Sequence, residues 1–446
     1  MSEIEFRTAG EIAADIRHGR VSSLEATERL LARVAVSSAV NAVVETCPDE
    51  ALEAAARADR AVAAGDELGP LHGVPMTVKD AINVAGLHTT WGNPAFADYV
   101  ADWDATLVRR LRGAGAIVFG KSNVHTMLGD FGQTDNEVYG RTNNPHDLTR
   151  TPGGSSGGGA AALAAGLTYL EYGSDLAGSI RLPAAYCGVY GLKPSAGVVP
   201  LHGFQPPGPP ALETEFPNIS NVGPLARSAG DLRTALQVTG GPVSEAMSWR
   251  LTPSRHQRLA DFRVGVVLDH EQARVSSEVG AVLSDKVDSL ARQGVKVVEG
   301  WPDDVNPVEQ LEAFGFQVEL FFALHGSDPD FATLAEVIEQ EHRRLAARAA
   351  WQRYFREVDV FLCPTSFTTA FPHDASPFDE RTITTSHGEQ PYDAQAFWIS
   401  PASLTGLPAL NLPAGRTAEG LPVGLQVIGP WQQDDTVITF AELAAG

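Results

Sequence analysis

The chain has 446 residues, of which 43% are hydrophobic and 20% are charged, a composition typical of a folded globular protein and not of a disordered one. Its 33 Lys and Arg residues against 55 Asp and Glu residues give a net charge of -22 with no clustered basic face, which disfavours nucleic acid and anionic membranes as partners. The sequence has no apolar run of about eighteen residues and no basic leader before an apolar segment. We therefore expect no membrane span and a cytoplasmic protein.

The cysteines and histidines give no sign of a structural or catalytic metal. Cys47, Cys187 and Cys363 are far apart, odd in number and without Cys-x-x-Cys spacing, so we expect buried, reduced thiols. None of the 12 histidines forms a short-range pair with metal-ligand spacing. The sequence predicts no disulfide, no metal site and no cofactor.

Residues 1–70 are predicted to be a helical N-terminal segment of the main domain. Ser22-Ser-Leu-Glu25 is a capping box that begins a helix reaching about Val34, and Ala51 to Ala64 is an Ala-rich helical run. Gly65-Asp-Glu-Leu-Gly-Pro70 then ends the helical pattern.

From Leu71 the pattern changes to short β-branched or aromatic runs that alternate with helical stretches, which indicates α/β architecture. A helix is expected over Ala105 to Arg112 and a strand over Ile117 to Phe119. Leu201 to Asn221 contains five prolines and no clear period. We expect this segment to be a long surface loop that forms one wall of a pocket.

The C-terminal part continues the alternation. A strand over Arg263 to Leu268 is followed by a helix over about Ser276 to Gln293, a strand over Val295 to Val298 and a long helix around Ala332 to Glu357. No internal repeat occurs, and no linker is long or polar enough to separate two halves. The sequence therefore predicts a single large domain whose main part spans residues 71–446.

Lysine is rare in this chain, and one lysine has an unusual context. Only five of the 33 basic residues are Lys, and Lys79 lies in the strand-like apolar run Gly73-Val-Pro-Met-Thr-Val-Lys-Asp80. A buried Lys can lose its proton, which Arg cannot do. Lys79 is therefore a candidate base, whereas Lys286 and Lys296, set among polar residues, are expected to be solvated.

A Gly-rich segment, Thr151-Pro-Gly-Gly-Ser-Ser-Gly-Gly-Gly-Ala160, stands out. It is not a phosphate-binding P-loop, because no Lys-Ser or Lys-Thr follows the glycines, and no strand precedes it as a dinucleotide fingerprint requires. Gly153-Gly-Ser-Ser-Gly157 matches GxSxG, but the nucleophile elbow also needs a hydrophobic strand before the Ser. Two interpretations remain: a structural turn before a small-residue helix, or a catalytic loop that acts with a second one.

The second loop runs from Gly173 to Pro183. Small residues at Ala177, Gly178 and Ser179 allow backbone N–H groups to converge on one point, as an oxyanion hole requires. Ser179 is thus a candidate nucleophile with donors beside it. It has no local histidine base.

Ser155 and Ser179, in Gly-rich loops 24 residues apart, together with the isolated Lys79, resemble the amidase signature family. The resemblance covers almost the whole chain. Further matching segments are Leu71 to Asp80, Gly120 to Asn123, Tyr139 to Asp147, Ser174 to Pro194, Val222 to Arg227, Cys363 to Thr365, Gly406 to Gly415 and Gly420 to Gln426.

The resemblance implies a Ser-Ser-Lys triad, in which Ser179 is the nucleophile, Ser155 bridges and Lys79 is the base. The bridging serine of the family follows a cis peptide bond, here Gly154-Ser155. The other implied roles are a hydrogen bond from Ser156 to Lys79, an oxyanion hole formed by the N–H groups of Leu176, Ala177, Gly178 and Ser179, and support of the loop by Asp175 and Arg181. Where Ala177 stands the family usually has Gly, so the methyl group narrows the expected oxyanion pocket.

The resemblance also implies a fold and a reaction: a large mixed sheet covered by helices on both faces, and hydrolysis of a neutral small-molecule carboxamide through an acyl-enzyme, with aryl esters or carbamates as further substrates. It implies a homodimer and no cofactor. Substrate-binding residues are expected near the site mouth, namely Gly129, Phe131, Phe204, Phe216, Tyr392, Phe397 and Trp398. Two alternatives stay open: the A-type subunit of a glutamine-dependent tRNA amidotransferase, and a non-catalytic scaffold of the same fold.

Overall fold

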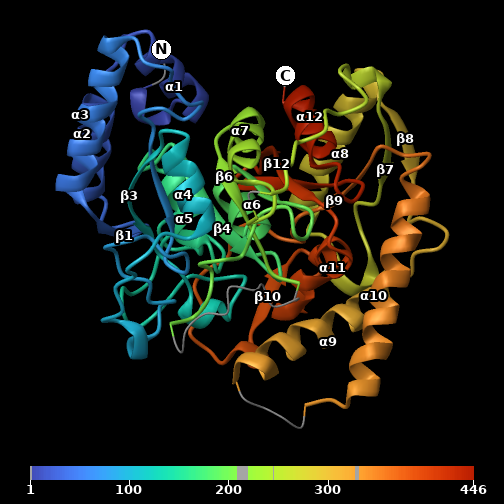
Figure 1. The fold of residues 1–446 in the computed structure, drawn as a ribbon. Coiled ribbons are helices and arrows are strands. Elements are labelled where there is room, and N and C mark those ends of the chain that lie inside the picture. Colours follow the sequence, from blue (N-terminus) through green and yellow to red (C-terminus); the bar gives the residue numbers. More distant parts are fainter. Residues whose placement is uncertain (1–2, 208–218, 245, 327–330, 446) are drawn as a thin grey trace.

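The computed structural model describes residues 3–207, 219–244, 246–326 and 331–445 (Figure 1). Within these ranges the centre of the molecule is an 11-stranded mixed sheet in the order β1-β3-β2-β4-β6-β5-β12-β13-β9-β7-β8. Helices cover both faces of this sheet (Figure 1). The predicted α/β class with a large mixed central sheet is confirmed.

The central strands are short and largely buried. The sheet contains β1 (Val43–Thr46), β2 (Pro75–Lys79), β3 (Ile117–Ser122), β4 (Leu170–Asp175), β5 (Tyr190–Lys193), β6 (Asn221–Ala226), β7 (Arg263–Val266), β8 (Lys296–Glu299), β9 (Val360–Pro364), β12 (Ala409–Arg416) and β13 (Pro422–Ile428). A separate hairpin contains β10 (Thr382–Thr385) and β11 (Gly388–Pro391). Every residue of β2, β3, β4 and β6 is buried, because helices close both faces of the sheet there.

The helices follow local capping signals. They are α1 (Ala9–Arg17), α2 (Ser23–Ala35), α3 (Pro48–Ala64), α4 (Thr106–Gly113), α5 (Gly157–Ala164), α6 (Arg181–Cys187), α7 (Ala229–Thr239), α8 (Ser277–Arg292), α9 (Pro307–Gly326), α10 (Leu334–Tyr354), α11 (Ala396–Thr405) and α12 (Asp434–Ala444). Helix α2 begins where the Ser22 side chain accepts a hydrogen bond from the Glu25 N–H, and α3 ends at Gly65 in the left-handed conformation.

The helical description of residues 1–70 is incomplete. Strand β1 lies inside this segment and pairs antiparallel with β3 at the edge of the sheet. Its four residues are all half-buried. A strand this short and uniformly half-buried produces no alternating pattern, so no signal in the sequence marks it.

Helix α9 was not predicted at all, although α4, α8 and α10 lie within a few residues of their expected positions. Apolar residues occur on all sides of α9 in the sequence, which hides the helical period. In the structure α9 packs on α11 and α10, and Leu311, Phe314 and Val318 also line a cavity. A helix with two apolar environments needs no polar face.

The register of the sheet brings Lys79 to the second loop. Strands β2 and β4 are parallel neighbours, with Thr77 opposite Glu171 and Val78 opposite Tyr172. Lys79 at the end of β2 therefore lies beside the end of β4, where the Gly173 to Pro183 loop begins. Helix α5 packs on the same strands.

The glycines at the start of α5 permit this close packing. A Cβ added at Gly158 would lie 2.3 Å from the backbone N of Asn123, and one added at Gly159 would lie 2.5 Å from Cγ of Glu171. The Gly-rich segment thus has a packing role, as the structural interpretation proposed, and it also places Ser155 and Ser156 beside Lys79.

The three cysteines are free, and Cys187 and Cys363 are buried as predicted. Cys47 is only half-buried, because it lies between edge strand β1 and helix α3. Among the described helices, none has both the length and the apolar character that a membrane crossing would require.

Candidate active site

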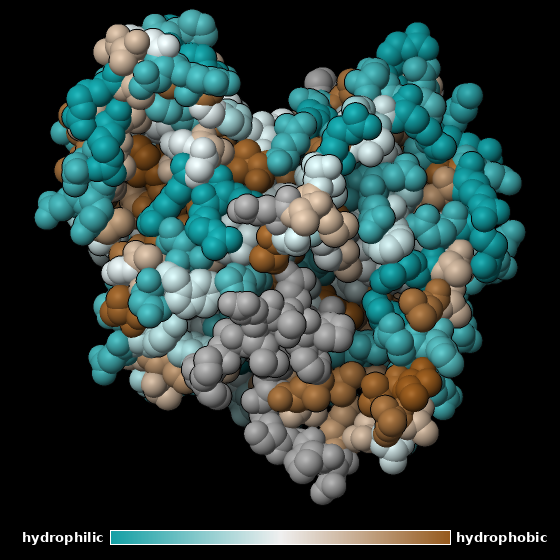
Figure 2. All heavy atoms as spheres, in the orientation of Figure 1, coloured by the Kyte–Doolittle hydropathy of each residue, from teal (hydrophilic) through white to brown (hydrophobic). Residues whose placement is uncertain are grey.

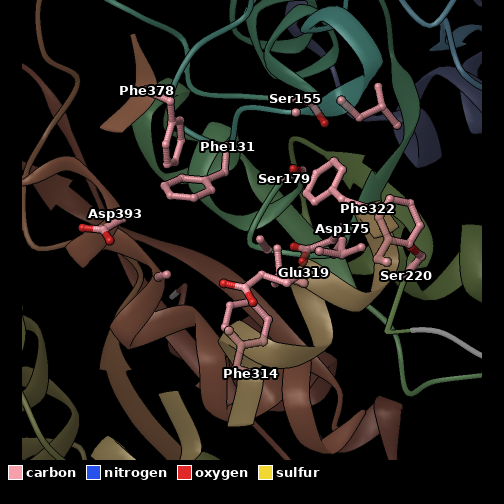
Figure 3. A pocket seen from close by; sticks show the side chains of 18 of the residues that line it. Phe131, Ser155, Asp175, Ser179, Ser220, Phe314, Glu319, Phe322, Phe378 and Asp393 are labelled. Atoms are coloured by element: carbon pink, nitrogen blue, oxygen red, sulfur yellow. The ribbon is translucent and has the colours of Figure 1, made fainter. Parts of the chain in front are cut away.

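A cavity of about 620 Å³ opens above the carboxyl ends of β2 and β4. Ser155, Ser174 and Ser179 line its inner end, and Figure 3 shows Ser155 and Ser179 facing the same open space. Its walls are mainly aromatic and aliphatic and include Phe131, Phe204 and residues of α9. The cavity is large enough to hold a small organic molecule against the serines.

Lys79 is fully buried beneath this cavity, and three serine hydroxyls surround its amine. Its Nζ lies 2.7 Å from Ser155 Oγ, 2.9 Å from Ser156 Oγ and 2.9 Å from Ser174 Oγ. The sequence expectation of a buried lysine among the Gly-rich loops agrees with this geometry.

Two other lysines are equally buried but have structural partners. Lys121 Nζ donates to the carbonyl oxygens of Ile82 and His88, and Lys193 Nζ donates to the carbonyl of its neighbour Pro194. Among these three buried lysines, Lys79 alone meets the serine hydroxyls of the Gly-rich loops.

Burial lowers the pKa of Lys79 well below its usual 10.5, because water no longer solvates the ammonium form. The carboxylates of Asp175 and Glu171 act in the opposite direction and raise the pKa, but they do not offset the burial. Burial therefore favours the neutral amine of Lys79, which is the form that a general base requires.

The hydrogen bonds of Ser156 fix the direction of one contact with Lys79. The Ser156 hydroxyl donates its proton to the carbonyl of Ser174 at 3.2 Å and accepts from the Ser174 N–H at 3.3 Å. Because its single proton is already donated, Ser156 Oγ can only accept from Lys79. The lone pair of a neutral Lys79 is thereby left for another hydroxyl.

Ser174 was not singled out from the sequence, although it contacts Lys79 as closely as Ser156 does. The residue lies at the end of β4 and faces the cavity. The available signal was its position beside Asp175 in a strand that is parallel to the strand of Lys79.

Ser179 lies in the Gly173 to Pro183 loop. Its side chain lines the cavity, and the residue is 6% exposed. Its carbonyl accepts a hydrogen bond from the Ser156 N–H at 3.2 Å, and the Gly154-Ser155 peptide bond is cis. Between the described side chains of Ser155 and Ser179 there is no direct hydrogen bond. Both hydroxyls therefore line the cavity without a hydrogen bond between them.

The N–H groups around Ser179 divide into two sets. Those of Leu176, Ala177 and Ser179 donate to no other described group, whereas the Gly178 N–H donates to Asp175 Oδ1 at 2.9 Å. Of the four N–H groups that were expected to hold the oxyanion, three are free in this geometry, because the Asp175 carboxylate accepts from the fourth.

Asp175 and Arg181 brace this loop from below. They form a fully buried ion pair at 2.8 Å, and Arg181 also donates to Gln426 Oε1 at 2.6 Å and to Ser403 Oγ at 2.6 Å. Burial alone would raise the pKa of Asp175, but the Arg181 guanidinium outweighs it and holds that pKa below its ordinary value. The charged pair ties the loop to α11 and β13.

Several predicted wall residues do line the cavity, and others do not. Gly129, Phe131 and Phe204 line it, whereas Phe216 lies outside the described residues. Tyr392 lies behind the wall: its ring stacks on Phe131 at 5.8 Å between centroids and its hydroxyl donates to Asp130.

The expectation for Trp398 is wrong, and Phe397 is likewise a core residue. Trp398 is fully buried, and its indole N–H donates to the carbonyl of Ala273 at 3.1 Å. The residue that turns toward the cavity from α11 is Ala396. A residue two positions further along a helix points to the opposite side, so Trp398 faces the core when Ala396 faces the cavity.

Helix α9 supplies the part of the wall that the sequence did not reveal. The cavity-lining residues of this helix are Leu311, Phe314, Gly315, Val318, Glu319, Phe321 and Phe322. Figure 2 shows hydrophobic atoms gathered over this helix, and Phe322 and Leu324 are exposed there. The apolar lining therefore continues from the cavity to the surface of the molecule.

The described residues contain no group of three His, Cys, Asp or Glu side chains arranged to hold a metal ion. The buried charged groups around the serines are Lys79, Asp175, Arg181 and Glu171, and each has hydrogen-bonding partners within the protein. The chemistry that these residues can perform is proton transfer between a buried amine and serine hydroxyls.

Comparison with known proteins finds relatives that match almost the whole chain. The acylamidase of Rhodococcus erythropolis is 32% identical over 468 residues, covering 98% of this chain and 94% of that protein. The A-type subunit of the glutamyl-tRNA(Gln) amidotransferase of Moorella thermoacetica is 32% identical over 480 residues, covering 96% and 93%.

A solved structure described as an unexpected vestigial protein complex that reveals the evolutionary origins of an s-triazine catabolic enzyme superposes with a TM-score of 0.82 at 29% identity, covering 98% of each chain. The family model named Amidase matches residues 25–312 and 303–438, which together span most of the sequence. The chain belongs to the amidase family.

Proposed function

We propose that this chain is a serine amidohydrolase that cleaves the C–N bond of a small carboxamide with a bulky apolar or aromatic part, through an acyl-enzyme on Ser179. The observation that carries the proposal is the position of Lys79 Nζ, 2.7 Å from Ser155 Oγ at the inner end of an apolar cavity that Ser179 also lines.

In the first half of the reaction, Ser179 Oγ attacks the carbonyl carbon of the amide. The Ser179 proton passes to Ser155, whose own proton passes to the lone pair of neutral Lys79. Because Ser156 can only accept from Lys79, the lone pair is left to Ser155 or Ser174, and we assign it to Ser155, which lies nearer, at 2.7 Å against 2.9 Å. The relay needs a hydrogen bond from the Ser179 hydroxyl to Ser155 Oγ. We expect this hydrogen bond to form when substrate fills the cavity.

The tetrahedral intermediate places a negative charge on the former carbonyl oxygen. The free N–H groups of Leu176, Ala177 and Ser179 are the donors available to it. As the C–N bond breaks, Lys79 returns its proton through Ser155 to the leaving nitrogen, and an ester forms on Ser179. Water then attacks this ester along the same relay, which releases the acid and restores the Ser179 hydroxyl.

The same nucleophile would accept aryl esters or carbamates, because the attacked carbonyl is alike in all three groups. Phe131, Phe204 and Phe314 surround the acyl or amine part of the substrate and favour apolar area at roughly 25 cal/mol per Å² buried. An anionic substrate gains no binding energy from this apolar wall, and the net charge of -22 repels it.

The alternative within the family is the A-type subunit of a tRNA amidotransferase, which the relatives of that name keep open. An aromatic wall does not suit glutamine, a small polar substrate, and a net charge of -22 does not favour tRNA. The free-standing hydrolase is therefore the preferred interpretation. A scaffold without activity would not need an unpaired Ser179 hydroxyl in an open cavity.

The test compares kcat/KM for an anilide, hexanamide and glutamine, the last also with added amidotransferase partner subunits. We expect the anilide to be the best substrate, Ser179→Ala and Lys79→Ala to abolish turnover, and Ser155→Ala to impair it strongly. Double substitutions within the triad should cost little more than the worst single one. A preference for glutamine, or additive losses, would overturn the proposal.

A further inference from the structure

The charged side chains on the cavity wall all have the same sign. Among the described residues that line it, the charged ones are Asp175, Glu319 and Asp393, and no Lys, Arg or His is present. An otherwise aromatic and aliphatic wall therefore has carboxylates but no cation to balance them.

The three carboxylates differ in their partners. Asp175 is paired with Arg181 and is committed to the loop. The side-chain carboxylates of Glu319 and Asp393 make no hydrogen bond or ion pair with any described residue. Glu312, seven residues earlier on the same helix, is not among the residues that line the cavity, and its carboxylate lies 3.6 Å from Arg343 of α10. Of these two acids of α9, Glu312 has a cationic partner, whereas Glu319, which lines the cavity, has none.

Figure 3 shows the Glu319 carboxylate projecting from α9 into the open centre of the cavity, while Asp393 lies at the opposite edge. Phe131, Phe314 and Phe322 border the same space. A carboxylate beside aromatic rings provides the groups that bind an organic ammonium ion, because it supplies a charge-assisted hydrogen bond and the ring faces attract a cation.

We propose that Glu319 forms a subsite for a protonated amine on the substrate, at a position away from the scissile amide. The inference rests on the proposed amide hydrolysis and names its substrate class: an amide with an apolar or aromatic body and a cationic group. It changes the expectation of a neutral substrate, since a cationic amide should exceed its neutral isostere. The carboxylate of Asp393, across the cavity, also attracts a cationic substrate electrostatically.

The first test measures kcat/KM for two matched pairs of probes. Para-(aminomethyl)acetanilide and para-ethylacetanilide place the charge on the amine side, and the anilides of para-(aminomethyl)benzoic acid and para-ethylbenzoic acid place it on the acyl side. We expect the cationic member of at least one pair to be favoured about fivefold to tenfold, the range of a charge-assisted bond at a solvent-accessible site.

The ratio of cationic to neutral kcat/KM should fall to near unity in Glu319→Gln and persist in Glu319→Asp. Glu312→Gln is the matched control, because it removes the same charge from the same helix outside the cavity. An unchanged ratio in Glu319→Gln, or an equal fall in Glu312→Gln, would overturn the subsite, because the preference would then come from elsewhere or from net charge alone.

A binding measurement separates this inference from the proposed function. Calorimetry with the Ser179→Ala protein should show tighter binding of the cationic probe than of its isostere, and the added Glu319→Gln change should remove the difference. A binding preference without hydrolysis in the wild-type protein would contradict the proposed function and support the subsite. Hydrolysis of both probes with equal binding would support the proposed function and contradict the subsite.

Discussion

Replacing Ser174 by Ala removes one of the three hydroxyls that meet the amine of Lys79. Ser174 Oγ lies 2.9 Å from Nζ, and both groups are buried. In the ammonium form of Lys79, Ser155, Ser156 and Ser174 each accept one N–H. In the neutral form, Ser155 donates to the lone pair and Ser174 accepts one of the two remaining N–H groups, so both forms lose a bond in the variant.

The two losses are unequal. A hydrogen bond to a charged group contributes about 1.5–3 kcal/mol, against about 0.5–1.5 kcal/mol between neutral groups, so the variant destabilises the ammonium by about 1 kcal/mol more than the amine. That difference lowers the pKa of Lys79 by roughly 0.7. Because the reactive form is the neutral amine, the rising limb of kcat/KM should move to lower pH by the same amount.

The assay is the pH profile of kcat/KM for a neutral anilide across the neutral and alkaline range, in wild type, Ser174→Ala and Ser174→Thr. The threonine variant keeps the hydroxyl, so the rising limb of its kcat/KM profile should have the same midpoint pH as that of the wild type. A midpoint that stays in place or rises in Ser174→Ala would refute the reasoning. A profile without any limb in the wild type would remove Lys79 as the base.

Three further predictions concern stability and the cavity wall. Burial raises the pKa of Glu171 to about 7 from 4.5, so its carboxyl supports the fold below about pH 4.5 and loses that contribution as the pH rises through 7. In urea unfolding, Glu171→Gln should therefore gain stability relative to wild type, on the order of 3 kcal/mol from acid to mildly alkaline pH; a constant difference would contradict this. Gly158→Ala should cost about 2–3 kcal/mol, because its Cβ would lie 2.3 Å from the backbone of Asn123, while Gly113→Ala in open space on α4 should stabilise by up to about 1 kcal/mol in the same assay. Phe131→Ala should lower kcat/KM for an anilide about tenfold and that for acetamide much less, and equal losses would exclude Phe131 as a wall for the aryl group.

The sequence predicted best those elements that carry a clear local pattern. Helix α8 was placed within a few residues because one face is apolar and the other polar, and the buried strands β3 and β7 were located from their short β-branched or aromatic runs. Edge strand β1 and helix α9 were missed, because a four-residue edge strand and a helix with apolar residues on all sides carry no period. Their positions depend on tertiary packing, which local patterns do not encode.

Lys79 and Ser179 could be located because an isolated Lys and a run of small residues mark them in the sequence, whereas the role of Ser155 came from the resemblance to the amidase signature family. The structure added what only three-dimensional packing decides: Ser174 beside Lys79, the Gly178 N–H bound to Asp175, and Trp398 turned into the core. Glu319 was equally hidden, since nothing in its local sequence shows that it faces the cavity. The sequence thus indicated the reaction more clearly than the substrate.

The most direct test of the central claim is covalent labelling with a fluorophosphonate, followed by peptide mapping by mass spectrometry. A single adduct on Ser179 is expected in the wild-type protein, no adduct in Ser179→Ala, and strongly slowed labelling in Lys79→Ala, because the amine activates the serine through Ser155. Labelling of a different serine, or labelling of Ser179 at an undiminished rate without Lys79, would contradict the Ser-Ser-Lys account.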